Sequence, residues 1–147
     1  MEMVSLIVME PGSEWPGHVG ESENVVELAE HEEPMLQRVR NRLDSLRLSG
    51  ARVRVAVLAC NEAADAATAA RREELALELL AGVAAVGFGR LVLNAAAHAS
   101  AQLRLELLSL AGSLSHACAG GAVVSVKFNE PDARRSSPQG RPIRSPL

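Results

Sequence analysis

A cysteine and a histidine at the ends of predicted strands are the residues that could perform nucleophilic chemistry. Cys60 and His98 each end an apolar run, and Asn61 and Glu62 follow the cysteine directly. A thiol needs a nearby imidazole or a positive dipole to be ionised at neutral pH. If the two runs form adjacent parallel strands, His98 could act as the base for Cys60. Asn61 could then stabilise an oxyanion while Glu62 orients the imidazole, which predicts a small Cys-His hydrolase or transferase.

A structural interpretation explains the same residues more simply. Cysteine is among the most buried residue types, so we interpret Cys60 as a small hydrophobic residue at the end of a buried strand. His98 reads as a residue at the entry to a helix. We favour this interpretation and expect the chain not to be an enzyme, with the hydrolase as the alternative.

Polar side chains follow three predicted strands at the points where ligands bind in open α/β sheets. Glu10 follows the first strand, Asn61 follows the second, and Ser100 is a good N-cap for the helix after the third. The long loop 10–24 could act as a lid, because long loops are often functional. The candidate ligand-binding residues are therefore Glu10, Trp15, His18, Cys60, Asn61, His98 and Ser100.

The strong cofactor and metal motifs have no match in this sequence. Gly87 and Gly89 form a fragment of a glycine pattern, but they precede a predicted strand where a phosphate loop should follow one. No histidine has the spacing to another ligand that a metal site requires, and His116 and Cys118, two positions apart, would point away from each other on a helix. We expect no cofactor and no metal.

Hydrophobic periodicity predicts alternating strands and helices. Apolar runs predict strands over 3–9, 52–60, 90–97 and 122–128, with a weaker candidate in 24–29. Leucine and valine stripes at spacings of three and four predict helices between 34 and 50, 68 and 87, and 100 and 120. This alternation implies βαβ crossovers. It predicts an α/β fold, a three-layer sandwich with a mostly parallel sheet of four or five strands and three main helices.

The chain divides into a predicted single α/β domain over 1–129 and a tail over 130–147. The tail is rich in proline, serine and arginine, and this composition predicts disorder. The layout of the domain is similar in general to Rossmann-like folds, including flavodoxin-like and universal-stress-like domains. Their phosphate-binding loops have no counterpart here, so the resemblance implies a fold and no function.

Composition excludes several classes of partner. The chain has 147 residues, a formal net charge of −3 and three aromatic residues, Trp15, Phe88 and Phe128. It therefore lacks the basic field and the stacking platforms of nucleic-acid binders. No apolar run reaches the roughly 20 residues of a membrane span, and no secretory signal is recognised, so we expect a cytoplasmic protein.

These observations predict a non-catalytic α/β domain with a regulatory or assembly role. We expect it to bind a small molecule or a protein partner, with a homo-oligomer as one form of such assembly.

Overall fold

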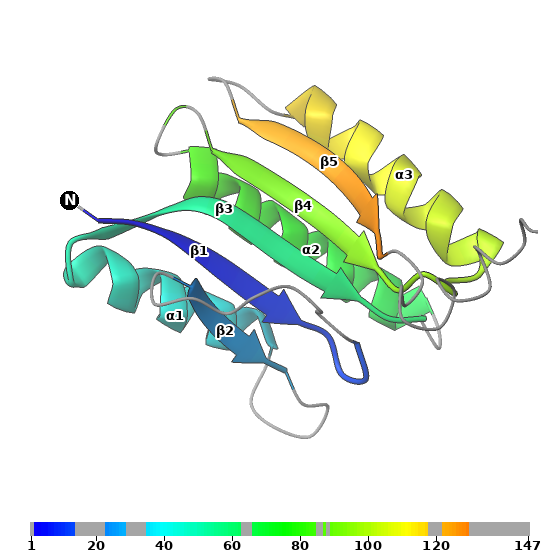
Figure 1. Ribbon diagram of the computed structural model, residues 1–147, viewed down its shortest axis with the longest axis horizontal. Coiled ribbons are helices and arrows are strands. Elements are labelled where there is room, and N and C mark those ends of the chain that lie inside the picture. Colours follow the sequence, from blue (N-terminus) through cyan, green and yellow to red (C-terminus); the bar gives the residue numbers. More distant parts are fainter. Residues whose placement is uncertain are drawn as a thin grey trace, which may run out of the picture.

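The computed structural model describes residues 2–13, 23–28, 35–62, 66–84, 87, 89–117 and 122–129. Strands and helices alternate through most of this part of the chain (Figure 1). The elements are β1 (Glu2–Met9), β2 (Glu23–Glu27), α1 (Met35–Leu48), β3 (Ala51–Cys60), α2 (Ala66–Ala84), β4 (Arg90–Ala95), α3 (Ala101–Ala117) and β5 (Val123–Phe128).

The five strands form one parallel sheet in the order β2-β1-β3-β4-β5. Met9 of β1 pairs with Ala59 of β3, and Cys60 of β3 pairs with Ala95 of β4, so the carboxyl ends of these strands meet at one edge. The predicted α/β class, the parallel sheet of four or five strands and the three main helices are confirmed, and β3 lies in the middle of the sheet. The weak strand candidate in 24–29 is also present, as β2.

The three described helices share one hydrophobic core with one face of the sheet. Leu6, Leu58 and Leu93 face this core from three strands, and Leu79 and Leu107 enter it from α2 and α3. Figure 1 shows α1 and α2 behind the sheet and α3 along β5. Ile7 of β1 and Val57 of β3, which point away from this core, are buried too, so the described sheet is not open on that side, which is consistent with the predicted three-layer sandwich.

Strand order explains why the helices share a face. The connections from β2 to β3, from β3 to β4 and from β4 to β5 all run in the same direction along the sheet. Right-handed crossovers in one direction place every connecting helix on the same side. The only step in the opposite direction, from β1 to β2, contains no described helix.

Two sequence predictions fall on parts of the chain that the structure does not describe. Trp15 and His18, with most of the proposed lid, lie outside the described residues, as does the tail from 130 to 147. Among the described helices, none combines the length and apolar character needed to cross a bilayer.

Candidate functional site

The segment after β1 forms a tight turn at the carboxyl edge of the sheet. The backbone N–H and the hydroxyl of Ser13 both donate to the carbonyl of Glu10, at 3.0 and 2.7 Å. Gly12 adopts a φ of 80°, and an added Cβ there would lie 2.6 Å from the amide nitrogen of Asn61. A side chain at position 12 would therefore be strained and would displace Asn61.

Glu10 and Arg72 form a buried, bidentate ion pair beside this turn. Nε and Nη2 of Arg72 donate to the two carboxylate oxygens of Glu10 at 2.7 and 2.8 Å. Both residues are buried, and such charges are tolerated only when paired and hydrogen-bonded. Burial by itself lowers the pKa of Arg72, but the hydrogen bonds and the charge of Glu10 outweigh it and raise the pKa.

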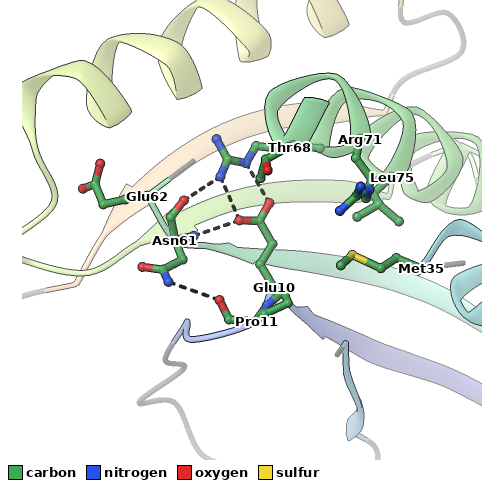
Figure 2. Close-up of a pocket in the computed structure, with 9 residues that line it drawn as sticks. Glu10, Pro11, Met35, Asn61, Glu62, Thr68, Arg71 and Leu75 are labelled. Carbon is green, nitrogen blue, oxygen red and sulfur yellow. Dashed lines mark hydrogen bonds and ion pairs between the residues drawn. The ribbon is translucent and has the colours of Figure 1, made fainter. Parts of the chain in front are cut away.

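Asn61 joins the pair to both strand ends. Its backbone N–H donates to Glu10 at 2.9 Å, and its carbonyl accepts from Nη2 of Arg72 at 2.6 Å. Its side-chain amide donates to the carbonyl of Pro11 at 3.1 Å. The turn after β1, the end of β3 and the first half of α2 are thus held in one fixed arrangement (Figure 2).

A hollow of about 100 Å³ opens over this network. The ends of β1 and β3, the start of α1 and the first turns of α2 surround it. Its lining residues are Glu10, Pro11, Met35, Asn61, Glu62, Thr68, Arg71, Arg72 and Leu75. The pocket lies at the carboxyl edge of the parallel strands, where α/β folds commonly bind ligands.

One side of this pocket combines a cation with apolar side chains. Arg71, Leu75 and Met35 lie on the opposite side of Glu10 from Glu62 (Figure 2). Arg71 is exposed and makes no ion pair with another described residue, whereas Arg72 is fully engaged by Glu10 and Asn61. The buried pair neutralises itself, so among the described lining residues Arg71 sets the charge on this side of the pocket.

Glu62 has a different role, because its hydrogen bonds stabilise the start of α3. The backbone N–H and the hydroxyl of Ser100 both donate to its carboxylate, at 2.9 and 2.8 Å. The hydroxyl of Ser100 also accepts from the N–H of Leu103 at 3.1 Å, which makes Ser100 the N-cap of α3. The bonds from Ser100 are the main reason why the pKa of Glu62 is lowered.

The structure places Cys60 and His98 in different surroundings. Cys60 is buried in the core shared with the helices, and its thiol donates to the carbonyl of Leu58 at 3.4 Å. Burial, followed by the charge of Glu10, raises the pKa of Cys60 well above its usual range, which opposes thiolate formation. His98 is exposed in the turn between β4 and α3.

The structure brings together some of the predicted residues and adds others. Glu10 and Asn61 meet in the pocket, and Ser100 binds Glu62 outside it. Sequence reasoning missed Arg71 and Arg72, together with Met35, Thr68 and Leu75. A signal for Arg72 was present, because it precedes Leu75 by three positions and so lies in register with the buried leucine stripe of α2.

No family model matches the chain, and comparison with curated proteins and with solved structures found no match. Within the described ranges, no group of three or more acidic, histidine or cysteine side chains is placed to hold a metal ion. The pocket itself is therefore the feature from which a function can be inferred.

Proposed function

We propose that this protein is a non-catalytic binding domain that holds a small organic anion in the pocket between β1, β3 and α2. The observation that carries the proposal is the exposed guanidinium of Arg71, which forms no ion pair with another described residue, beside the apolar side chains of Met35 and Leu75. A planar guanidinium matches a carboxylate in a bidentate geometry, and the apolar side chains suit a short aliphatic group.

The size of the pocket limits the ligand. An apolar cavity of about 150 Å³ accommodates benzene, so a hollow of about 100 Å³ encloses on the order of four non-hydrogen atoms, and the remaining atoms of a slightly larger ligand lie at its open side. A contact of this size gives weak affinity, with a Kd of about 1 mM for a simple probe. A natural ligand could bind more tightly by extending out of the open side.

Isobutyrate and its neutral isostere isobutyramide provide a direct test. By isothermal titration calorimetry, isobutyrate should bind and isobutyramide should bind at least about 10-fold more weakly, because it lacks the charge that Arg71 recognises. Arg71→Gln should remove this preference. The matched control is Arg90→Gln, which neutralises an exposed arginine at the start of β4 and should bind like the wild type. Equal binding of the two probes would refute the proposal.

The two remaining expectations from the sequence stay predictions. A cytoplasmic location is one, and the Cys-His hydrolase that uses Cys60 and His98 is the other. The raised pKa of Cys60 argues against the hydrolase, and the alkylation experiment described below decides it.

A further inference from the structure

The outward face of α3 lacks the charges that a solvated helix normally carries. Its exposed residues include no Asp, Glu, Lys or Arg. They are Ala101, Gln102, Leu105, Leu108, Ser109, Gly112, Ser113, Ser115 and His116. The exposed residues of α1 and α2, in contrast, include Arg40, Asp44 and Arg47 on one helix and Arg71, Glu73 and Glu74 on the other.

Two leucines project from this face of α3. Leu105 is 67% exposed and Leu108 is 53% exposed, although the buried side of the same helix already contributes Leu103, Leu107 and Leu114 to the core. The helix therefore has a second apolar stripe that the described part of the chain leaves uncovered. Exposed apolar surface with few charges is typical of a surface that binds another protein.

The spacing of the outward stripe is that of a short helix-pairing seam. Ala101, Leu105, Leu108 and Gly112 are separated by four, three and four positions, which is the alternation seen where two helices pack along their length. Gly112 has open space around it, so another helix can approach closely at that point.

We infer that this face binds the same face of a second copy of the chain, with the two α3 helices antiparallel. In this arrangement Leu105 of each copy meets Leu108 of the other, and Ala101 meets Gly112. The two leucine layers lie next to the two-fold axis, with the small residues on either side. One surface then supplies both partners, as a two-fold symmetric interface requires.

The distribution of exposed charges favours α3 of the second copy, rather than its α1 or α2, as the partner. Burying unpaired charges against an uncharged apolar face is energetically unfavourable. The exposed faces of α1 and α2 carry several charges each, whereas the charged residues of α3, Arg104 and Glu106, are half-buried and engaged by backbone carbonyls and by Arg72. Among the described helices, α3 is therefore the matching surface.

The expected association is weak and reversible. A helix of 17 residues is about 25 Å long, so pairing through α3 alone buries much less than the roughly 800 Å² per partner of a standard stable interface. We therefore expect a monomer–dimer equilibrium that becomes visible at concentrations of about 0.1 to 1 mM.

Sedimentation equilibrium of the full chain over this range tests the inference. The wild type should shift toward the dimer mass, and Leu105→Glu should remain monomeric, because two carboxylates would be buried near the two-fold axis. Leu77→Glu is the matched control: it changes a leucine of α2 that is 44% exposed and should leave the dimer intact. A wild type that stays monomeric throughout, or a Leu105→Glu variant that still dimerises, would overturn the inference.

Cysteine cross-linking tests the orientation, in a background that carries Cys118→Ala. A mixture of the Ala101→Cys and Gly112→Cys proteins should form a mixed disulfide dimer, whereas each protein alone should not. Cross-linking of the Ala101→Cys protein with itself would indicate parallel helices and would contradict the antiparallel arrangement.

Discussion

At the scale of single residues, Arg72 is the clearest case of a side chain that needs a partner from elsewhere in the fold. It lies in the buried stripe of α2, and its counter-charge, Glu10, is 62 positions away in the sequence. Arg72 lies three positions before Leu75, on the buried side of the same helix, and this spacing could have indicated that Arg72 is buried. The identity of its partner could not be predicted, because only the strand order brings the end of β1 next to α2.

Breaking the Glu10–Arg72 pair should destabilise the fold strongly. Glu10→Leu leaves a buried guanidinium without its main counter-charge, since Glu106 pairs with Arg72 only at 3.5 Å, and we expect the free energy of unfolding to fall by about 3 to 5 kcal/mol in urea denaturation. The double variant Glu10→Leu/Arg72→Met removes both charges and should recover a large part of this loss.

The control for this prediction is Glu78→Gln. It breaks the exposed pair with Arg40, at 3.2 Å, and should cost less than about 1 kcal/mol. If the double variant is no more stable than Glu10→Leu, the pair does not have the role assigned to it.

Cys60 should behave as a core residue rather than as a nucleophile. In a Cys118→Ala background, Cys60 is the remaining cysteine, and alkylation of the native protein at pH 8 should be at least about 100-fold slower than in urea, because it requires opening of the core. A thiol that reacts rapidly in the native state below pH 7, and loses this reactivity in His98→Ala, would restore the hydrolase hypothesis.

The pKa of Cys60 also predicts a pH dependence of stability. An unfolded thiol has a pKa of about 8.5, whereas burial raises the pKa of Cys60 in the folded state. Above about pH 8.5 the unfolded state therefore binds fewer protons than the folded state, and the free energy of unfolding falls as pH rises. Denaturation between pH 7 and 10 should show this decline in the wild type and a smaller one in Cys60→Ala.

At the scale of elements, the start of α3 depends on contacts from two parts of the chain. Ser100 was predicted as an N-cap from the sequence, and its bond from Leu103 confirms this. The contribution of Glu62 could not be predicted, because it requires β3 and β4 to be neighbours in the sheet.

Ser100→Ala should weaken α3 by removing this cap. We expect a loss of about 1 kcal/mol in the free energy of unfolding, measured by urea denaturation. Ser109→Ala, in the exposed middle of the same helix, is the matched control and should be neutral or slightly stabilising, because alanine has the higher helix propensity. Equal losses in the two variants would show that the cap contributes nothing specific.

The same bonds make the cap sensitive to acid. The pKa of Glu62 is lowered in the folded state, so its contribution to stability is present above its unfolded pKa of about 4.3 and is lost as pH falls through the folded value. Glu62→Gln should therefore flatten the acid side of the stability profile while changing the alkaline side little.

At the scale of the whole molecule, periodicity was sufficient to predict the class of fold, because most strands and helices bury a regular apolar pattern. The shared face of the three helices follows from strand order, which no single element encodes. The pocket was predicted only in part: Glu10 and Asn61 directly follow strands, whereas Arg71, Met35 and Leu75 reach the pocket from helices that the sheet positions.

Titration of the 15N-labelled protein with isobutyrate, followed by 1H–15N correlation spectra, tests the central claim most directly. Binding in the pocket predicts concentration-dependent shifts of the backbone amides of Asn61, Thr68 and Arg71, which should be much smaller with isobutyramide at the same concentration and should lose this difference in Arg71→Gln. Shifts confined to other arginines, such as Arg47 or Arg90, would contradict the account, as would a spectrum that does not change at concentrations well above 1 mM.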